Sequence, residues 1–339
     1  MIKEITRQEE VDNTHIREYM MKNEHLEVRF LNIGGALTKI AMQHDNYNEN
    51  LVLAYHHLKD YLNNTCYLNT IIGRTSNRIK DGQFPLNDKT IQVDLNDGRN
   101  NLHGGSDCLV HHYFEVEPIN EGYRLKATLP HQENGFPGNV TVQVDYTLKN
   151  NKLNINYKAT TDQDTIVNLT QHTYFNLSGN LKTNIYNHKL QIIANQVAEV
   201  DENSSFTTKE ILVTDTLFDF RQPTTINHNT KKRHSLFEKT DGYDHLYLLN
   251  GKQDEKQANI LFSDPESGRS LKISTTEPAV QFYAGNHIAG NLIFEHHRQG
   301  EKNLGACFET HKIPYDFQSQ IIKPGDIYQQ QTTFEFTKI

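Results

Sequence analysis

The stretch VTVQVDYTLKNNKLNINYKA, residues 140–159, carries the clearest structural signal in the chain. Apolar side chains recur at every second position on both sides of the polar break KNNK, residues 149–152. Side chains of a β-strand alternate between its two faces, so this period of two predicts a strand with one buried face on each side of the break. The break itself predicts the turn of a β-hairpin.

Similar strand-like runs recur along the rest of the chain. They lie at residues 26–30, 189–193, 245–249, 271–274 and 331–336. Convincing helical patterns are rare, although residues 207–210 are expected to form a short turn of helix. Many strands separated by Gly, Asn and Asp turns predict an all-β fold, a large antiparallel β-sandwich. Since the chain contains no linker rich in Pro, Gly or Ser, we expect a single domain over residues 1–339.

The bulk composition limits the class of protein. With 34 Lys and Arg residues against 42 Asp and Glu residues, the formal net charge of −8 argues against a nucleic-acid binder, which normally carries a basic patch. No stretch approaches the ~18 apolar residues of a membrane-spanning helix. The N-terminus lacks the apolar region of a signal peptide, and the three cysteines show neither disulfide nor zinc spacing. We therefore expect a cytoplasmic protein with no membrane or nucleic-acid partner.

Dense polar segments interrupt the strand pattern, and two lie in the first third of the chain. GRTSNR, residues 73–78, combines two arginines with an asparagine, which suits hydrogen bonding to adjacent sugar hydroxyls. The alternative is a turn held by structural salt bridges. His103 precedes two glycines that would let the backbone approach a ligand closely. A tight turn would explain the same glycines.

The strongest candidates for proton transfer lie further along the chain. Period two places His172 and Tyr174 on one face of a strand, and an imidazole beside a phenol can handle protons. The alternative is a core histidine with its hydrogen bonds satisfied. Glu309 lies in a stretch of small and apolar residues, where partial desolvation raises the pKa of a carboxyl group toward that of a useful base. The alternative interpretation is that Glu309 forms a structural ion pair with an arginine.

Two more segments supply candidate binding residues. Asp244 follows a strong Asp-Gly turn signal and can accept hydrogen bonds from sugar hydroxyls, or simply hold the turn. Gln281 begins the polar segment QFYAGN, residues 281–286. The chain contains no Trp, so the aromatic surface on which sugars often stack would have to come from Tyr174, Phe282 or Phe308. The nucleotide-binding, nucleophile-elbow and H-E-x-x-H motifs are also missing from the sequence.

Taken together and in order, these segments resemble the galactose mutarotase (aldose 1-epimerase) family over about residues 29–336. The motifs that carry the resemblance are GRxxNRI at 73–79, LHGG at 102–105, GFPG at 135–138, NLTxHxYFNL at 168–177, DGxDH at 241–245 and GxxxET at 305–310. The family's fold is a large, mostly antiparallel β-supersandwich with its site on a concave sheet face. This chain departs from the family pattern at residues 131–134, His311 and Tyr315, which affects loop contacts and substrate preference.

The resemblance also implies roles for individual residues. His172 matches the family's catalytic acid and Glu309 its catalytic base. Positions that match sugar-binding residues are Asn77, Arg78, His103, Tyr174, Asp244 and Gln281. The implied activity is interconversion of the α and β anomers of free hexoses such as galactose and glucose, with no cofactor and no metal.

Several alternatives stay open at this point. A hexose-6-phosphate 1-epimerase would need a further basic cluster near C6. A non-catalytic sugar-binding module could share the scaffold, and a glycoside hydrolase would need two carboxyl groups about the scissile bond. The physiological aldose and the oligomeric state are also left open by the sequence.

Overall fold

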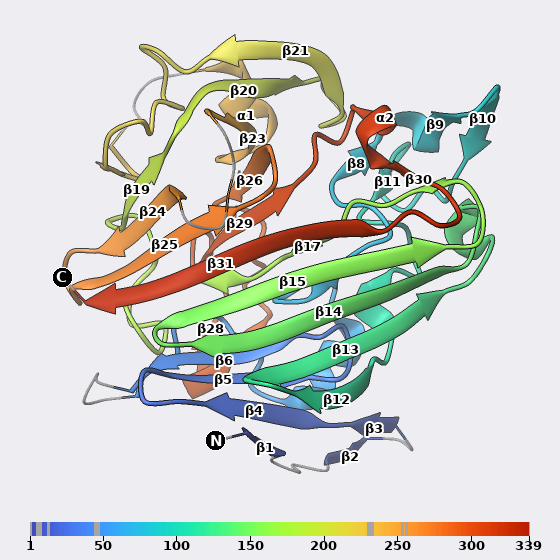
Figure 1. Cartoon of the computed structure of the whole chain (residues 1–339). Helices are drawn as coiled ribbons and strands as arrows, with labels where there is room; N and C mark the ends of the chain where they lie inside the picture. Colours follow the sequence, from blue (N-terminus) through green and yellow to red (C-terminus); the bar gives the residue numbers. More distant parts are fainter. Residues whose placement is uncertain are drawn as a thin grey trace.

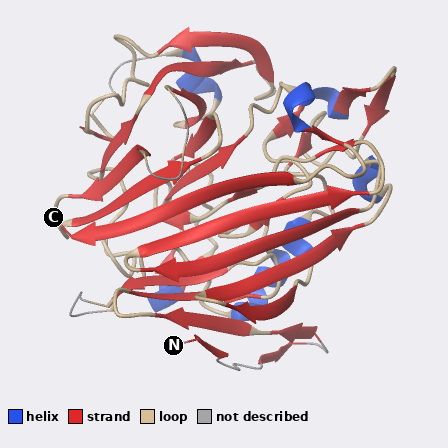
Figure 2. Cartoon of the chain, viewed as in Figure 1, coloured by secondary structure: helices blue, strands red, loops and turns tan. Residues whose placement is uncertain are grey.

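The computed structural model describes residues 2–4, 9–11, 14–43, 48–228, 234–251, 254 and 257–338. Strands dominate this part of the chain, and its helices are short (Figure 2), which confirms the predicted all-β class. The helices are α1 (Ser235–Lys239), α2 (Phe317–Gln320), η1 (Leu58–Asn63), η2 (Lys80–Gly82), η3 (Leu109–His111), η4 (Glu133–Gly135) and η5 (Glu295–His297). None of the helices in the described ranges has the length and apolar character needed to cross a bilayer.

The largest sheet has nine antiparallel strands, and its long strands run across the front of Figure 1. In spatial order they are β12 (Glu115–Ile119), β13 (Gly122–Leu129), β14 (Val140–Lys149), β15 (Lys152–Thr161), β31 (Tyr328–Lys338), β25 (Arg269–Thr275), β24 (Ala258–Asp264), β19 (Lys189–Ile192) and β22 (Thr224–Thr225). The hairpin predicted from residues 140–159 is confirmed, because β14 and β15 pair from Val140↔Thr161 to Lys149↔Lys152. The alternating apolar residues of both strands are buried, as period two requires.

A second antiparallel sheet has six strands. In order they are β18 (Tyr174–Phe175), β29 (Ala306–His311), β26 (Ala279–Tyr283), β23 (Asp244–Leu249), β20 (Ala194–Val200) and β21 (Phe206–Leu212). Residues 207–210 lie in β21, so the expected turn of helix is wrong. Within this segment Glu210 pairs with Ala198 of β20, residues 207–209 lie where the register of the pair shifts, and the β-branched Thr207 and Thr208 favour a strand over a helix.

A four-stranded sheet lies below the large sheet in Figure 1. Its order is β1 (Ile2–Glu4), β4 (Glu18–Lys22), β5 (Leu26–Leu31) and β6 (Leu37–Met42). The remaining strands form short pairs: β2 (Glu9–Val11) with β3 (Thr14–Ile16), β7 (Ile71–Ile72) with β17 (Thr170–Gln171), β8 (Arg78–Ile79) with β11 (Asn101–Leu102), β9 (Gln83–Leu86) with β10 (Lys89–Gln92), β16 (Thr165–Ile166) with β30 (Ile321–Ile322), and β27 (Ile293–Phe294) with β28 (Arg298–Gln299).

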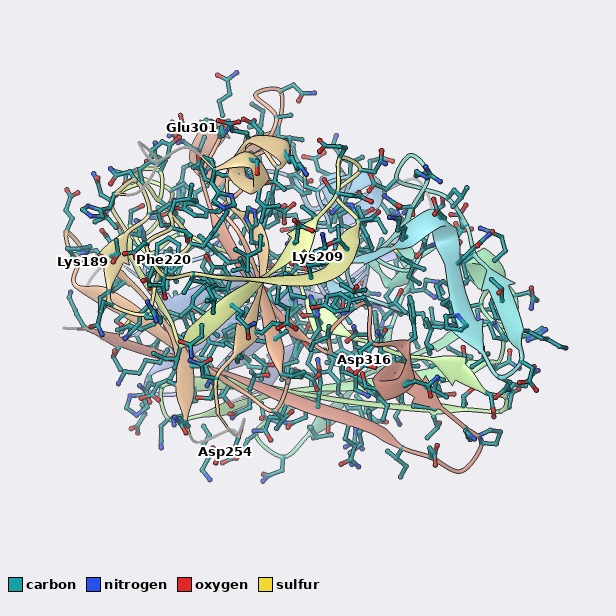
Figure 3. All side chains as sticks on the ribbon, turned by 90° about the horizontal axis from the view of Figure 1, so that it is seen from above. Lys189, Lys209, Phe220, Asp254, Glu301 and Asp316 are labelled. Atoms are coloured by element: carbon teal, nitrogen blue, oxygen red, sulfur yellow. The ribbon has the colours of Figure 1, made fainter. Side chains whose placement is uncertain are left out.

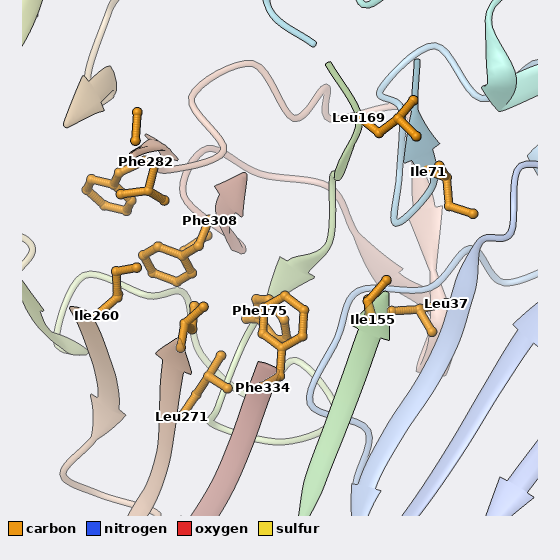
Figure 4. Packing of buried hydrophobic residues seen from close by; sticks show 14 of the residues in the cluster. Leu37, Ile71, Ile155, Leu169, Phe175, Ile260, Leu271, Phe282, Phe308 and Phe334 are labelled. Carbon is orange, nitrogen blue, oxygen red and sulfur yellow. The ribbon is translucent and has the colours of Figure 1, made fainter. Parts of the chain in front are cut away.

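One large apolar cluster connects these sheets. It extends along the chain from Tyr19 to Phe336 and takes side chains from all three of the larger sheets. Figure 4 shows Phe175, Phe308 and Phe334 converging in this core. Figure 3 shows the described side chains from above, and the apolar side chains of this cluster pack the sheets against one another.

Candidate active site

A cavity of about 250 Å³ lies where the six-stranded sheet meets the loops around β8 and β11. Its lining comes from segments that are far apart in the sequence: Thr65, Cys66, Tyr67, Asn77, Arg78, Leu102, His103, His172, Tyr174, Asp244, Gln281, Tyr283, His287 and Glu309. All eight residues that the sequence marks as candidates for catalysis or sugar binding are in this set. The fold therefore brings the predicted site residues together in a single pocket.

Some residues that line the cavity were not predicted from the sequence. Tyr283 could have been found, because it follows Gln281 by two positions in β26 and strand faces repeat with period two. Tyr67 could not, since nothing in the local sequence predicts its left-handed backbone, with φ of 55°. This conformation is uncommon for a bulky residue. The ring of Tyr67 packs 4.6 Å from that of His103.

The six-stranded sheet presents the carboxyl groups of the site. Glu309 lies opposite Gln281 on the neighbouring strand, and paired residues share a face. The intervening residues Phe282 and Phe308 face the other way, into the core, where their rings stack 5.5 Å apart. The expectation that either phenylalanine could stack on a sugar is therefore wrong. Of the three aromatic residues considered, Tyr174 is the one that lines the cavity.

Asn77, just before β8, and His103, just after β11, form a small paired unit in the lining of the pocket. Both have left-handed backbones, with φ of 62° and 55°. The main-chain N–H of His103 donates to the carbonyl of Asn77 at 3.1 Å, and the N–H of Asn77 donates to Nδ1 of His103 at 3.2 Å. Because Nδ1 is an acceptor, a neutral His103 carries its proton on Nε2 and is a hydrogen-bond donor there.

The glycines after His103 have a structural explanation. Gly104 has a φ of 92°, and a Cβ at this position would lie 2.5 Å from the backbone nitrogen of Arg74. A side chain does not fit there, because the two backbone segments approach too closely. The tight-turn alternative therefore accounts for this glycine.

The two arginines of the segment at residues 73–78 have different surroundings. Arg74 is buried, and its guanidinium donates to the carbonyls of Leu129, Pro130 and Pro137. It belongs to the support of a loop and is outside the cavity lining. Arg78 lines the cavity, and its Nε donates to Oδ2 of Asp97 at 2.7 Å. The structural alternative thus describes Arg74, while Arg78 belongs to the pocket.

His172 and Glu309 meet inside the pocket. Nε2 of His172 lies 3.5 Å from Oε1 of Glu309, and the two residues are 5% and 2% exposed. Two backbone hydrogen bonds hold His172 in the segment between β17 and β18. The N–H of His172 donates to the carbonyl of Thr70, and the carbonyl of His172 accepts from the N–H of Asn69. The ring of Tyr174 lies 5.1 Å from the imidazole, so the two side chains are neighbours as predicted, although His172 lies in the break between β17 and β18 and not within a strand. The other oxygen of Glu309, Oε2, is buried and has no hydrogen-bond partner among the described residues.

Burial shifts the proton affinities of both groups. It lowers the pKa of His172 to about 4. Burial, reinforced by the nearby Asp244 carboxyl and opposed by Arg78, raises the pKa of Glu309 well above its usual range. Both shifts favour the neutral form, since a low-dielectric site penalises charge. A protonated His172 in this pocket is thus a strong acid, and an ionised Glu309 is a strong base.

A chain of side-chain hydrogen bonds organises the remaining polar groups. Nδ2 of Asn77 donates to Oε1 of Gln281 at 2.9 Å, and Nε2 of Gln281 donates to Oδ1 of Asp244 at 2.6 Å. Burial raises the pKa of Asp244 as well. Since each member is held by the next, the polar surface is arranged before any ligand enters.

The pocket also contains a set of atoms close enough to hold a metal ion. Ligand atoms of His103, His172 and Glu309 all lie within 4.8 Å of one another. A metal-binding histidine usually donates its second ring N–H to an acceptor. Nδ1 of His103 instead faces the N–H of Asn77 and accepts from it. The surroundings of His103 therefore suit a donor to a ligand oxygen better than a metal ligand.

Comparisons with known proteins agree with the resemblance seen in the sequence. The family model described as Aldose 1-epimerase matches residues 17–335. A galactose mutarotase from Bos taurus is 32% identical over 328 residues, which are 95% of this chain and 94% of that protein. An aldose 1-epimerase from Escherichia coli K12 is 31% identical over 285 residues, 81% of this chain and 82% of that one. The crystal structure of a galactose 1-epimerase from Lactobacillus acidophilus superposes with a TM-score of 0.86 at 28% identity, covering 100% of this chain and 98% of that chain.

Proposed function

This chain belongs to the aldose 1-epimerase family, and from that premise we propose that it interconverts the α and β anomers of free hexoses such as galactose and glucose, with His172 and Glu309 exchanging the protons. The protein is an isomerase of the mutarotase class. The observation that carries the assignment of residues is the contact of 3.5 Å between a buried imidazole and a buried carboxyl group inside the pocket.

Glu309 acts as the base of ring opening. Its Oε2 atom is buried and has no hydrogen-bond partner in the described part of the chain, so this atom is available to the C1 hydroxyl of a sugar. A desolvated carboxylate beside Asp244 gains from taking a proton, because protonation removes a buried charge. Glu309 accepts the C1 hydroxyl proton while the C1 oxygen becomes the oxygen of the aldehyde.

His172 acts as the acid of the same step. As the C1–O5 bond breaks, its electron pair goes to the ring oxygen, which takes the proton from Nε2 of the imidazolium. The low proton affinity of the buried imidazole makes this transfer favourable. The open-chain aldehyde rotates about C1–C2, and ring closure on the other face of C1 returns both protons along the same routes.

The pair holds one transferable proton at every stage of this cycle. Before ring opening the proton is on His172 and Glu309 is ionised; afterwards it is on Glu309 and His172 is neutral. Burial favours this second, neutral arrangement. The charged arrangement forms from the neutral one when this proton passes from Glu309 to His172 across their 3.5 Å contact, so the cycle needs no exchange of protons with solvent.

The other predicted residues hold the sugar. Asn77, Arg78, Asp244 and Gln281 present donors and acceptors to its hydroxyl groups, and Tyr174 supplies an apolar ring face. His103, with Nδ1 occupied by the amide of Asn77, directs an Nε2–H donor into the pocket. A donor beside the ring oxygen would assist His172 by stabilising negative charge that develops there.

The rival substrates and activities fit the pocket less well. A hexose 6-phosphate needs a cluster of cations, but Arg74 is engaged with backbone carbonyls and Arg78 is paired with Asp97. The carboxyl groups of Asp244 and Glu309 would repel a phosphate. A glycoside hydrolase needs two carboxyl groups about the scissile bond, whereas Glu309 here faces an imidazole. A non-catalytic module would have no use for a buried acid–base pair.

Exchange NMR tests the proposal. The protein should accelerate exchange between the α and β signals of galactose and glucose, and it should act poorly on glucose 6-phosphate. Exchange at the spontaneous rate for every free aldose in a panel would contradict it. A strong preference for the 6-phosphate would favour the rival epimerase.

We further propose that the chain works in the cytoplasm as one domain over residues 1–339. The cysteines Cys66, Cys108 and Cys307 are free thiols, which suits a reducing compartment. The large core cluster takes residues from both ends of the chain, which suits one cooperative unit. A single calorimetric unfolding transition would support the single domain, and two separable transitions would contradict it.

A further inference from the structure

Cys307 lies directly beside the imidazole of His172. It precedes Glu309 by two positions in β29, so its side chain shares the pocket-facing side of the strand. Its Sγ atom is 3.4 Å from Nδ1 of His172, and the residue is fully buried. One strand thus carries both the proposed base and a polar neighbour of the proposed acid.

The two ring nitrogens of His172 have separate surroundings. Nε2 faces Glu309, and Nδ1 faces the sulfur of Cys307. In the proposed reaction the Nε2 proton leaves and returns, so Nδ1 has to keep its own proton throughout the cycle. A group at Nδ1 therefore has to accept a hydrogen bond, and a thiol sulfur is a weak acceptor.

We propose that Cys307 is a positioning residue for the reaction: its sulfur accepts the Nδ1 proton of His172 and leaves Nε2 as the nitrogen that exchanges its proton with the ring oxygen. This inference rests on the proposed function, because it assigns the tautomer that the acid needs. Cys307 acts through His172 and makes no contact with the sugar in this scheme.

The weakness of the sulfur acceptor has a chemical consequence. A strong acceptor such as a carboxylate would stabilise the imidazolium and make it a poorer acid. Burial, with Glu309 and Asp244 nearby, raises the pKa of Cys307 well above its usual range, so the sulfur is a neutral thiol. A neutral, weak partner orients the ring and leaves the imidazolium acidic. This suits protonation of a sugar ring oxygen.

The comparison with His103 indicates different roles for the two imidazoles. Nδ1 of His103 accepts from the amide of Asn77, so its neutral form has the proton on Nε2. Nδ1 of His172 faces an atom that can accept, so its neutral form can have the proton on Nδ1. His103 is then a fixed donor, and His172 is the group that can gain and lose a proton at Nε2.

Other ionisable groups contribute to any pH profile measured at this site. They come from the elements around the two residues: Glu309 on β29, Asp244 on β23, Tyr283 on β26, His287 after β26, Tyr174 on β18, Arg78 on β8 with its partner Asp97, His103 after β11, and Cys66 and Tyr67 from the loop after η1. Substitutions at Cys307 leave all of these groups in place. A change in the profile of a Cys307 variant relative to the wild-type protein thus reports the altered partner of His172.

The test compares Cys307→Ala and Cys307→Ser with the wild-type protein, using kcat for galactose between pH 5 and 9. Alanine removes the acceptor, so kcat should fall by about 10- to 100-fold, the range seen when the partner that orients a metal-binding histidine is lost. The alkaline limb marks loss of the one proton that His172 and Glu309 share, so it belongs to the pair and lies above the pKa of the buried imidazole. This limb should move to lower pH, because the imidazolium loses a partner. Serine offers a stronger oxygen acceptor and should move that limb to higher pH with a smaller loss of kcat. A purely structural role would not produce opposite shifts.

Cys108→Ala is the matched control, since Cys108 is also a buried thiol and lies outside the pocket. It should keep the wild-type profile. Wild-type kcat and pH profile in Cys307→Ala would overturn the role of Cys307, as would equal losses in the alanine and serine variants without any shift of the limb. Failure of the wild-type protein to interconvert anomers would refute the proposed function instead.

A measurement on the wild-type protein covers the case in which the variants fold poorly. Imidazole-¹⁵N NMR, with the His172 signal identified by its loss in His172→Asn, reports which ring nitrogen carries the proton. Protonation at Nδ1 in neutral His172 supports the proposal, and protonation at Nε2 overturns it.

Discussion

Nε2 of His172 lies 3.5 Å from Oε1 of Glu309, and both residues are almost completely buried. Among the residues that the structure describes, neither side chain forms an ion pair with an arginine or a lysine. The Nε2 atom of an imidazole and a carboxyl group that are buried together in this way can exchange a proton with each other or with a molecule in the pocket. This relationship is the basis of the predictions that follow.

Replacing Glu309 with Gln should remove the base and keep the shape of the side chain. We expect kcat for galactose mutarotation to fall by about 10²–10⁴-fold, the usual contribution of a positioned acid or base. The melting temperature should be unchanged or higher, because the substitution removes a desolvated carboxyl group. Exchange NMR and calorimetry measure the two quantities. A near-normal kcat would refute the assignment of the base.

Replacing His172 with Asn should remove the acid and retain a polar side chain. We expect a comparable loss of kcat, with binding of galactose preserved, because Asn77, Arg78 and Gln281 remain in place. Calorimetric titration of the variant with galactose provides the control. If the affinity for galactose falls while kcat at saturating sugar is normal, His172 is a binding residue.

The two arginines at residues 74 and 78 should respond to the same substitution in different ways. Arg78→Lys should raise KM for galactose, because a lysine lacks the planar fork that can bond Asp97 and a sugar hydroxyl together. Arg74→Lys should mainly lower stability, since each lost bond from a buried guanidinium is worth about 1.5–3 kcal/mol. Steady-state kinetics and urea unfolding distinguish the two results. The reverse pattern would mean that Arg74 contacts the sugar.

Stability should fall as the pH is lowered from about 6.5 toward 4. Burial lowers the pKa values of His172, His188 and His311 to about 4 and that of His245 to about 3. In the unfolded chain these histidines take up protons near pH 6.5. The stability that they contribute above that pH is therefore lost as the pH falls toward their pKa values in the folded protein. Each uncompensated proton changes the free energy of unfolding by about 1.4 kcal/mol per pH unit.

Three carboxyl groups and one histidine oppose this trend. Burial raises the pKa of Glu277 to about 7, that of Glu309 well above its usual range and that of Asp244, and the hydrogen bond to Glu133 raises the pKa of His112. These groups favour the folded state as the pH falls. Burial also lowers the pKa values of His103 and His111, so the lowered histidines outnumber the opposing groups, and the net slope should stay positive between pH 4 and 6.5. Urea midpoints measured across this range test the sign, and His245→Gln should flatten the curve. A stability that is constant or increases on acidification would contradict the prediction.

Local patterns in the sequence were sufficient for much of the fold. The alternation at residues 140–159 predicted a hairpin that the structure contains, because a half-buried strand requires that period. The strand at residues 207–210 was harder to predict from the sequence, since these polar residues lie on an edge strand and do not alternate with apolar ones. The choice between Tyr174, Phe282 and Phe308 was also out of reach from the sequence. It depends on which face of each strand meets the core.

The sequence by itself determined the strand-rich class, the residue types of the site and the order of the motifs, because these follow from side-chain chemistry and local periodicity. Only the tertiary structure decided that His172 and Glu309 come into contact, that Arg78 but not Arg74 reaches the pocket, and that Cys307 lies against Nδ1 of His172. Such contacts depend on how β18, β29 and β26 pair across long stretches of chain. Pairing of distant strands is set by the packing of the whole core, and no local segment contains that information.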